Sequence, residues 1–385
     1  MVVLQHAHLL EAGVNIGGSA VDVFFVLSSF LLTMLFEAKT RQLLARRAGV
    51  RQWAFALIDY FSKRFLRVYP LFAAVAVLLW VLPLDARARY YTLGAPEQYD
   101  LFKVLTFDPH QRFFVFWTLP LEIAYYFLIP LLVLGVCLLG RAWPLAVAPL
   151  YLWVVSEGLT IDRRPFLPLR PHLSTFVAGS LAAIVYAQLA QFVKQRGVEL
   201  KGWKLVTAVR GLQLSLFALV MSLAFHGLVF HWFAPNPFEQ HEGASPFLSV
   251  PMSALIVLEL LFPSLLSPLL EWKLLTYAGK VSFSMYLLHP FVLKHPWIEN
   301  GQETWHDQFF AWFVLVFALA TAAYWAIEHP SQLLAQRVSA HLRAMERRHQ
   351  MANATLPTSP RSSMSPLNVG QLCLERLYQS GRKIV

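Results

Sequence analysis

Cysteine and charged residues are both scarce in this chain of 385 residues. The two cysteines, Cys137 and Cys373, do not support a disulfide framework or a cysteine metal site, so no metal is expected. Charged residues make up only 14% of the sequence, against 57% hydrophobic residues. That balance is too apolar for a soluble globular protein of this length. The sequence therefore indicates an integral membrane protein.

Long apolar runs account for most of the chain. A helix needs about 20 residues to cross a bilayer, and nine runs are predicted to do so. They lie at 20–36, 68–84, 115–139, 142–159, 172–193, 211–233, 250–271, 281–298 and 308–327. The first ten residues are also apolar, but as a helix they would cover only about 15 Å, half of the hydrocarbon thickness. We expect an all-α, polytopic membrane bundle of about ten transmembrane helices, with the first one truncated.

Basic residues are concentrated in alternate connections between the predicted spans. Three quarters of the 32 lysines and arginines lie in one set of segments, namely 37–67, 140–142, 194–210, 271–280 and 328–385. Connections rich in Lys and Arg stay in the cytoplasm. We therefore expect a cytoplasmic carboxy terminus, with outer connections at 85–112, 160–171, 234–249 and 299–307. The concentration of basic residues in these cytoplasmic segments accounts for the net charge of +10. No nucleic-acid partner is therefore expected.

The carboxy-terminal segment differs in composition from the rest of the chain. Residues 1–330 show no repeat and no composition shift, and we interpret them as one membrane domain. Residues 331–385 are basic and rich in Ser, Pro and Thr, which predicts a disordered cytoplasmic tail; a partner-binding tail is the alternative. The segment from Ala38 to Arg51 alternates bases with leucines and is expected to lie on the membrane surface as an amphipathic helix.

Two ionisable residues near the amino terminus are candidates for chemistry. His6 lies in VVLQHAHLL, and a neutral imidazole is well suited to take a proton near pH 7. A histidine packed among helices is the alternative. Asp22 heads the apolar helix GSAVDVFFVLSSF, where a bare carboxylate would cost roughly 2.5 kcal/mol or more. The paired serines of that helix, Ser28 and Ser29, are weak candidates for a nucleophile.

Two arginines form a candidate phosphate site. Arg64 and Arg67 in YFSKRFLRVYP are spaced i and i+3, so they share one face of a helix. Guanidinium groups bind phosphates with good geometry, so the pair could hold a phosphate-bearing ligand at the cytoplasmic end of the helix. The alternative is ordinary anchoring of a cytoplasmic helix end.

Polar side chains also mark two other apolar helices. WTLPLEIAYYFLIP begins at Trp117 and carries Glu122 as its only acid, which we expect to pair with an arginine or a tyrosine hydroxyl. GKVSFSMYLLHP places Ser282, Tyr286 and His289 at i, i+4 and i+7 as one polar stripe. This stripe predicts either a polar path for a substrate or hydrogen bonds between helices.

These segments resemble the motifs of the acyltransferase 3 family in the family's order. GSAVDVFFVLSSF is similar to GVDLFFVLSGF, YFSKRFLRVYP to RRxLRIYP, WTLPLEIAYYFLIP to WSLSVEEQFYLLWP, GKVSFSMYLLHP to GxxSYSLYLxH, and AIEHP to IExP. The resemblance maps the family's first-span histidine onto His6. It also supports donor binding by Arg64 and Arg67, whereas we read Glu328 of AIEHP as structural.

The resemblance implies an activity and its partners. Members move an acetyl or similar acyl group from acyl-coenzyme A, a co-substrate rather than a bound cofactor, to a hydroxyl of a polysaccharide, glycolipid or other cell-envelope acceptor. The lipid bilayer is the remaining expected partner, at the bacterial inner (plasma) membrane. His6 would then act as general base, Arg64 and Arg67 would hold the donor, and Asp22, Trp117, Glu122, Ser282, Tyr286 and His289 would be supporting polar sites.

One part of the family pattern is missing. The first-span arginine of the family would lie about six residues before Met1, so either the natural protein begins upstream, which we favour, or this form is truncated and inactive. A transporter or flippase of a small solute or lipid-linked sugar is the rival function. A non-catalytic family member is a third possibility.

Overall fold

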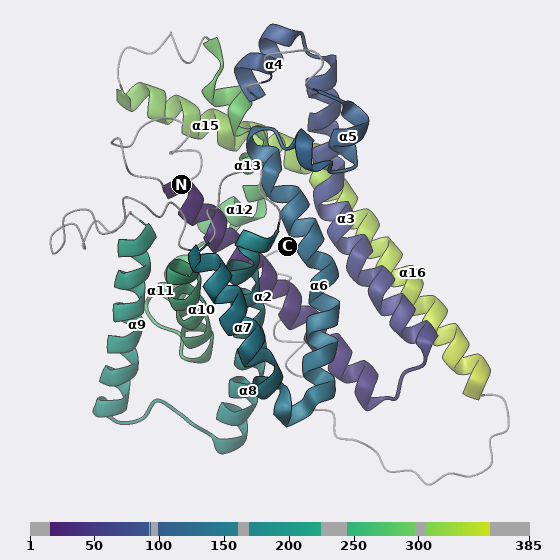
Figure 1. The fold of residues 1–385 in the computed structure, drawn as a ribbon, viewed down its shortest axis with the longest axis vertical. Coiled ribbons are helices and arrows are strands. Elements are labelled where there is room, and N and C mark those ends of the chain that lie inside the picture. The colour runs from purple at the N-terminus through teal and green to yellow at the C-terminus, as the bar shows by residue number, and fades with distance from the viewer. Residues whose placement is uncertain are drawn as a thin grey trace. The chain divides into compact units, whose positions relative to one another are not determined.

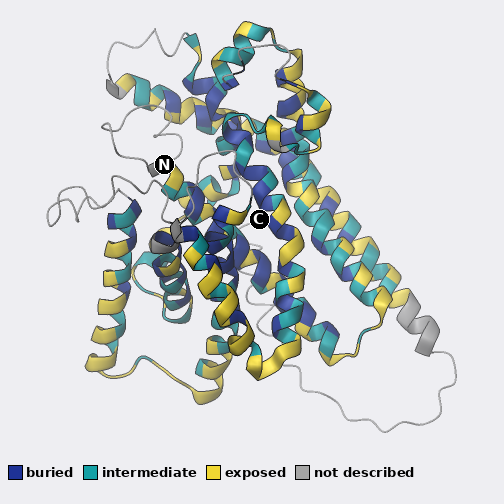
Figure 2. Ribbon diagram, in the orientation of Figure 1, coloured by how far each residue is buried: buried dark blue, intermediate teal, exposed yellow. Residues whose placement is uncertain are grey.

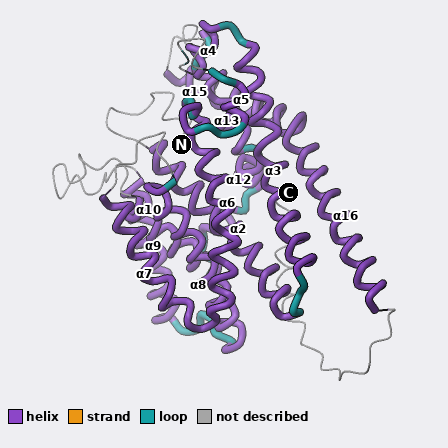
Figure 3. The backbone as a smooth tube through the Cα atoms, turned by 45° about the vertical axis from the view of Figure 1, so that its right-hand side comes forward, coloured by secondary structure: helices purple, strands orange, loops and turns teal. Residues whose placement is uncertain are grey.

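The computed structural model describes residues 16–91, 93, 99–160, 169–224, 245–296 and 305–354. Within these ranges the chain consists of helices joined by turns and loops, and no strand occurs there (Figure 3). The all-helical membrane architecture expected from the sequence is confirmed.

The chain forms two compact units, each assembled from two stretches of sequence. Unit 1 comprises Met1–Glu37 and Ala88–Trp272, and unit 2 comprises Ala38–Arg87 and Lys273–Val385. Helix α2 (Ile16–Ala45) therefore contributes to both units, and so does the short helix α4 (Leu84–Tyr91).

Unit 1 contains the longer run of helices after α2. They are α5 (Leu101–Leu105), α6 (Thr118–Leu139), α7 (Trp143–Thr160), α8 (Leu173–Arg196), α9 (Trp203–Ala224), α10 (Ser245–Leu261) and α11 (Leu266–Leu270). Helix α10 packs against both α8 and α9, and α7 packs against α8 (Figure 1). Phe30 of α2 joins Ala182, Ala183 and Val257 in one buried apolar cluster. One apolar cluster of unit 1 thus lies where α2, α8 and α10 meet.

Glycines end two helices of unit 1. Gly140 follows α6 with φ of 56°, and Gly197 follows α8 in the left-handed conformation with φ of 58°. Residues with a Cβ rarely adopt such angles. Each glycine thus stops its helix and starts a short connection to the next one.

Unit 2 is built on two long helices that lie side by side. Helix α3 (Val50–Val81) pairs with α16 (His329–Ala354) along its length (Figure 1). Helices α12 (Lys273–Lys280), α13 (Ser282–Leu293) and α15 (Trp305–Ala323) complete the unit, and α13 packs against α15. A π-helical turn at Tyr324–Glu328 joins α15 to α16 and contacts α3.

Among the residues that the structure describes, six helical segments are long and apolar enough to cross a membrane. They are Gly17–Ala45, Val50–Val81, Phe114–Gly158, Arg170–Arg196, Trp203–Ala224 and Asp307–Arg348; two shorter apolar helices lie at Leu248–Leu261 and Ser282–Leu293. Many large apolar side chains on these helices are exposed, including Leu131, Leu152 and Leu214. Figure 2 colours the exposed positions along the helices yellow. Lipid would cover such side chains in a membrane. The total of about ten spans stays a prediction.

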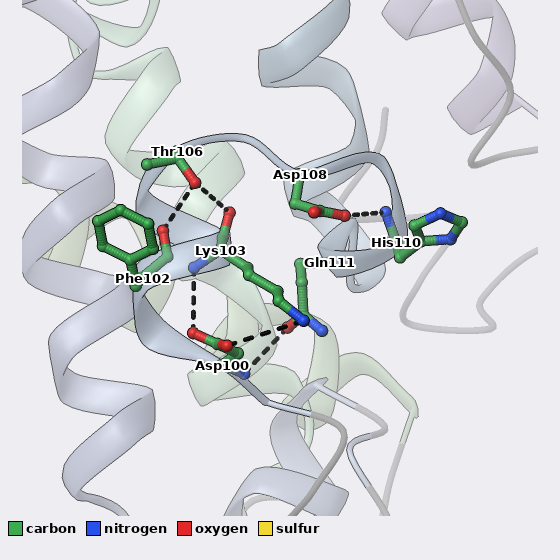
Figure 4. Close-up of polar contacts among 7 residues, drawn as sticks. All are labelled: Asp100, Phe102, Lys103, Thr106, Asp108, His110 and Gln111. Carbon is green, nitrogen blue, oxygen red and sulfur yellow. Dashed lines mark hydrogen bonds and ion pairs between the residues drawn. The ribbon is translucent and has the colours of Figure 1, made fainter.

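A capped loop connects α4 to α6 within the predicted outer connection. Asp100 caps α5 by accepting a hydrogen bond from the Lys103 backbone N–H, and its own N–H donates to the Gln111 side chain at 3.1 Å (Figure 4). Asp108 accepts from the His110 backbone at 2.8 Å. Burial lowers the pKa of the nearby Arg112, while the charge of Asp108 opposes that change. Side-chain caps therefore order this connection without any regular long helix.

Two segments differ from the sequence expectation. The segment expected to be a surface helix between Ala38 and Arg51 is instead the end of α2, which continues to Ala45, and the start of α3 at Val50. The stretch 37–45 has no Gly or Pro to stop a helix. Residues 331–354, expected in the disordered tail, belong to α16, while residues 355–385 lie outside the described part.

Candidate functional site

Buried carboxyl groups lie on α2 and α6 of unit 1. Asp22 is 6% exposed and Glu122 is 4% exposed. The Ser28 hydroxyl donates a hydrogen bond of 2.6 Å to Oε1 of Glu122. A carboxylate buried in an apolar bundle needs such donors, because its desolvation is otherwise costly. The two helices are thus joined by a polar contact where each sequence is otherwise apolar.

Aromatic side chains surround this contact. Phe25 of α2 stacks on Phe176 of α8 with ring centroids 4.4 Å apart, and Phe176 stacks on Tyr125 of α6 at 4.6 Å. Trp117 and His172 lie against each other at 5.6 Å, and both also contact the Phe25 ring. His172 is 1% exposed. The arrangement places an imidazole and an indole beside the helix that carries Asp22.

Three hydroxyl groups form a chain next to the aromatic stack. Tyr125 shares a 2.7 Å hydrogen bond with Ser180, and Thr33 donates to Ser180 at 2.9 Å. Ser29 donates instead to the backbone carbonyls of Phe25 and Val26 in its own helix. The Ser29 hydroxyl is therefore committed to the backbone, which argues against its use as a nucleophile.

A second polar cluster lies in unit 2, at the π-helical turn. Glu328 is 2% exposed, and its Oε1 accepts a short hydrogen bond from the Ser284 hydroxyl of α13. Arg67 of α3 is exposed and lies close enough to interact electrostatically with Glu328. π-Helical turns insert one residue into a helix and occur frequently at functional sites. Here the turn directs a carboxylate into the interior of unit 2.

The two arginines proposed for phosphate binding lie within a long helix. Arg64 and Arg67 sit 14 and 17 residues after the start of α3 at Val50, which places them about 21 Å and 26 Å along it. Lys63 of the same stretch forms an ion pair of 2.7 Å with Asp59. The ammonium group of Lys63 is thus paired within its own helix. Arg67 instead lies close enough to Glu328 to interact with it electrostatically.

The polar stripe on α13 is uneven in its burial. Ser282 is exposed and donates to the Gly279 carbonyl in the preceding turn, while His289 is fully buried. Nδ1 of His289 lies 2.7 Å from the Tyr286 carbonyl oxygen. Because a carbonyl can only accept, Nδ1 carries the proton in that bond. The bond from α13 to Glu328 comes from Ser284, which is outside the predicted stripe.

Comparison with known families decides the identity of the fold. A family model described as an acyltransferase domain, that of acyltransferase 3, matches residues 2–329. The chain belongs to the acyltransferase 3 family. No curated protein and no solved structure matches it significantly. The resemblance seen in the sequence is confirmed, and membership implies acyltransferase activity in a multi-pass membrane protein.

Both polar clusters of this acyltransferase 3 protein fall inside the matched range. Of the predicted site residues, Asp22, Trp117 and Glu122 lie in unit 1, whereas Arg64, Arg67, Ser282, Tyr286 and His289 lie in unit 2. His6 lies outside the described residues. The chemical roles of all these residues stay predictions.

Two buried residues in the acyltransferase 3 fold, His172 and Ser284, were missed in the sequence. His172 had a signal, because it stands at the head of the predicted span 172–193. Ser284 had none, since GKVSFSMYLLHP holds serines on two faces of its helix. Glu328, read from the sequence as structural, is the buried hydrogen-bond partner of Ser284. Within the described residues, no group of three or more His, Cys, Asp or Glu side chains is placed to hold a metal ion.

Proposed function

We propose that this protein transfers an acetyl or similar acyl group from cytoplasmic acyl-coenzyme A to a hydroxyl of a polysaccharide, glycolipid or other cell-envelope acceptor. The observation that carries the proposal is the family match over residues 2–329. It is supported by the membrane-spanning helices and by buried polar clusters in both units.

The proposed chemistry assigns each group one task. His6 removes the proton from the acceptor hydroxyl, and the oxygen attacks the thioester carbonyl carbon. The tetrahedral intermediate then collapses, the carbon–sulfur bond breaks, and coenzyme A leaves as the thiol after taking up a proton. Donors and positive groups near the carbonyl oxygen would stabilise the intermediate. Arg64 and Arg67 hold donor phosphates, which contributes to binding rather than to bond breaking.

Replacement of a donor arginine tests the proposal. In membranes that contain the protein and labelled acetyl-coenzyme A, Arg67→Gln should raise KM for the donor about tenfold or more, because a charged hydrogen bond to phosphate is lost. The kcat should change less, since the contact holds both ground state and transition state. Arg51→Gln is the matched control, because Arg51 is on the same helix but lies over the Phe55 ring.

His6→Ala should abolish transfer to cell-envelope glycans.

A negative result has a clear form. Correctly inserted protein that neither binds coenzyme A nor transfers label to any of several glycan and glycolipid acceptors would contradict the proposed activity. Uptake of a lipid-linked sugar by vesicles that contain the same protein would then favour the transporter function.

A further inference from the structure

Tyr324 has an unusual environment at the π-helical turn of unit 2. Its side chain is fully buried in a cluster with Val281 and Ala320. Its hydroxyl makes no hydrogen bond to any described residue. Buried hydroxyl groups are nearly always hydrogen-bonded, so this one needs a partner that the described residues do not supply.

Two cations meet at this tyrosine. The Lys280 ammonium lies 5.4 Å from the Tyr324 ring centroid. Arg67 lies close enough to Tyr324 to interact with it electrostatically, and it makes no hydrogen bond or ion pair with a described residue. Both cationic side chains are accessible, since Arg67 is exposed and Lys280 is half-buried. They come from separate helices, α3 and α12, and converge on one aromatic side chain.

The surrounding charge leaves room for an anion. Glu328 is the acid that interacts electrostatically with Arg67, and its carboxylate also accepts a hydrogen bond from Ser284. Two cations, Arg67 and Lys280, thus lie near Tyr324, with one carboxylate close to Arg67. A phosphate group matches this environment because it accepts hydrogen bonds from ammonium, guanidinium and hydroxyl groups at once.

We propose that Lys280 and the Tyr324 hydroxyl join Arg67 in binding one phosphate group of the acyl-coenzyme A donor. This inference rests on the proposed function and adds two donor-binding residues to it. The π-helical turn positions two of the groups involved, because Tyr324 begins it and Glu328 ends it.

Binding of coenzyme A to the purified full-length chain in detergent, measured by calorimetry, tests the inference. Lys280→Gln should weaken binding about tenfold, and Tyr324→Phe about fivefold, because each removes one hydrogen bond to a charged group. Lys280→Arg should retain most of the affinity. The matched controls are Lys273→Gln, on the same helix, and Tyr277→Phe, whose hydroxyl already bonds Thr321. Both controls should bind within twofold of the unchanged protein.

The outcomes separate this inference from the proposed function. If the unchanged protein binds no coenzyme A, the proposed function fails. If it binds and Arg67→Gln weakens binding, while Lys280→Gln and Tyr324→Phe behave like their controls, only the further inference fails. If Lys280→Gln does not fold, Lys280→Met is the substitute, because it keeps the apolar stem and removes the ammonium group. Its affinity for coenzyme A should be about tenfold weaker as well.

A lipid phosphate is the competing source of the same chemistry. Native mass spectrometry of the Lys280→Gln variant, with phosphatidylglycerol added, measures retained lipid. Loss of bound lipid with unchanged affinity for coenzyme A would overturn the donor assignment. Loss of affinity for coenzyme A in lipid-free detergent supports it.

Discussion

At the scale of single residues, both units contain the same kind of hydrogen bond between helices. A buried glutamate accepts a hydrogen bond from a serine on a neighbouring helix, as Glu122 does from Ser28 and Glu328 does from Ser284. Serine is small enough to sit on an apolar helix without disturbing its packing, yet it supplies a donor where water is absent. Each of these hydrogen bonds ties a carboxylate to a neighbouring helix.

Removal of the Ser28 hydroxyl should lower stability measurably. Ser28→Ala takes a donor from the buried Glu122 carboxylate, and hydrogen bonds between membrane helices contribute about 0.6 kcal/mol on average and about 1.7 kcal/mol at most. We expect a loss in that range, read as a lower midpoint of thermal unfolding in detergent. Ser282→Ala is the matched control, because Ser282 is exposed and its hydroxyl donates to the Gly279 carbonyl three residues earlier in the chain. Equal stability of the two variants would contradict the contact.

The kinds of residue in these clusters could be predicted from the sequence, but their partners could not. An acid such as Glu122 in an apolar span must be buried against a donor. That the donor is Ser28, 94 positions away, depends on how helices pack. Periodicity gave the stripe of Ser282, Tyr286 and His289, yet Ser284 makes the bond to Glu328. In membrane helices both faces are apolar, so periodicity does not tell which face contacts protein.

At the scale of helices, the tightest described glycine contact joins α2 to α8. A Cβ at Gly179 would collide with the Ser29 hydroxyl and the Val26 carbonyl oxygen. Small residues let membrane helices approach until their backbones nearly touch. This approach brings Phe25 onto Phe176 and Thr33 within reach of Ser180.

Gly179→Ala should therefore loosen the α2–α8 contact. We expect a destabilisation of about 1–3 kcal/mol, the usual cost of an added group in a filled interior, and a lower unfolding midpoint. Gly211→Ala on α9 is the control, since nothing lies within 4 Å of its added Cβ. Alanine also favours helix by up to about 1 kcal/mol over glycine, so the control should be neutral or stabilised. A stabilised Gly179→Ala variant would contradict the close approach.

Helix positions were better predicted than helix ends. Each of the nine predicted spans overlaps a helix in the described part of the chain. The apolar core of a span is set by composition, whereas its polar extensions are set by packing. α3 and α16 continue well past their apolar parts because they pair with each other. The sequence around 38–51 and 331–354 carried no signal of that pairing.

At the scale of the whole molecule, the predicted orientation in the membrane rests on the distribution of basic residues and not on the fold. Two exposed lysines report on opposite predicted sides: Lys201 in the connection between α8 and α9, and Lys103 in the capped loop before α6. Their exposure makes both suitable for chemical labelling.

Labelling of single cysteines should give opposite results at these two positions. With Cys137 and Cys373 replaced by Ser, Lys103→Cys in intact cells should react with a membrane-impermeant maleimide. Lys201→Cys should react only after the membrane is opened, because its connection is predicted to be cytoplasmic. Reaction of Lys201→Cys in intact cells would show that the predicted orientation is wrong. The face that carries Arg67 would then lie outside the cytoplasm, away from acyl-coenzyme A.

The π-helical turn at Tyr324–Glu328 also limits how the length of the chain can vary. α15, the turn and α16 form one uninterrupted helical run, so no loop is there to absorb a change. Deletion or insertion of one residue in the turn would rotate all of α16 by about 100° relative to α15. The face that packs on α3 would then turn away, together with Glu328. Spacing, as much as residue type, is thus encoded between Ala320 and the start of α16.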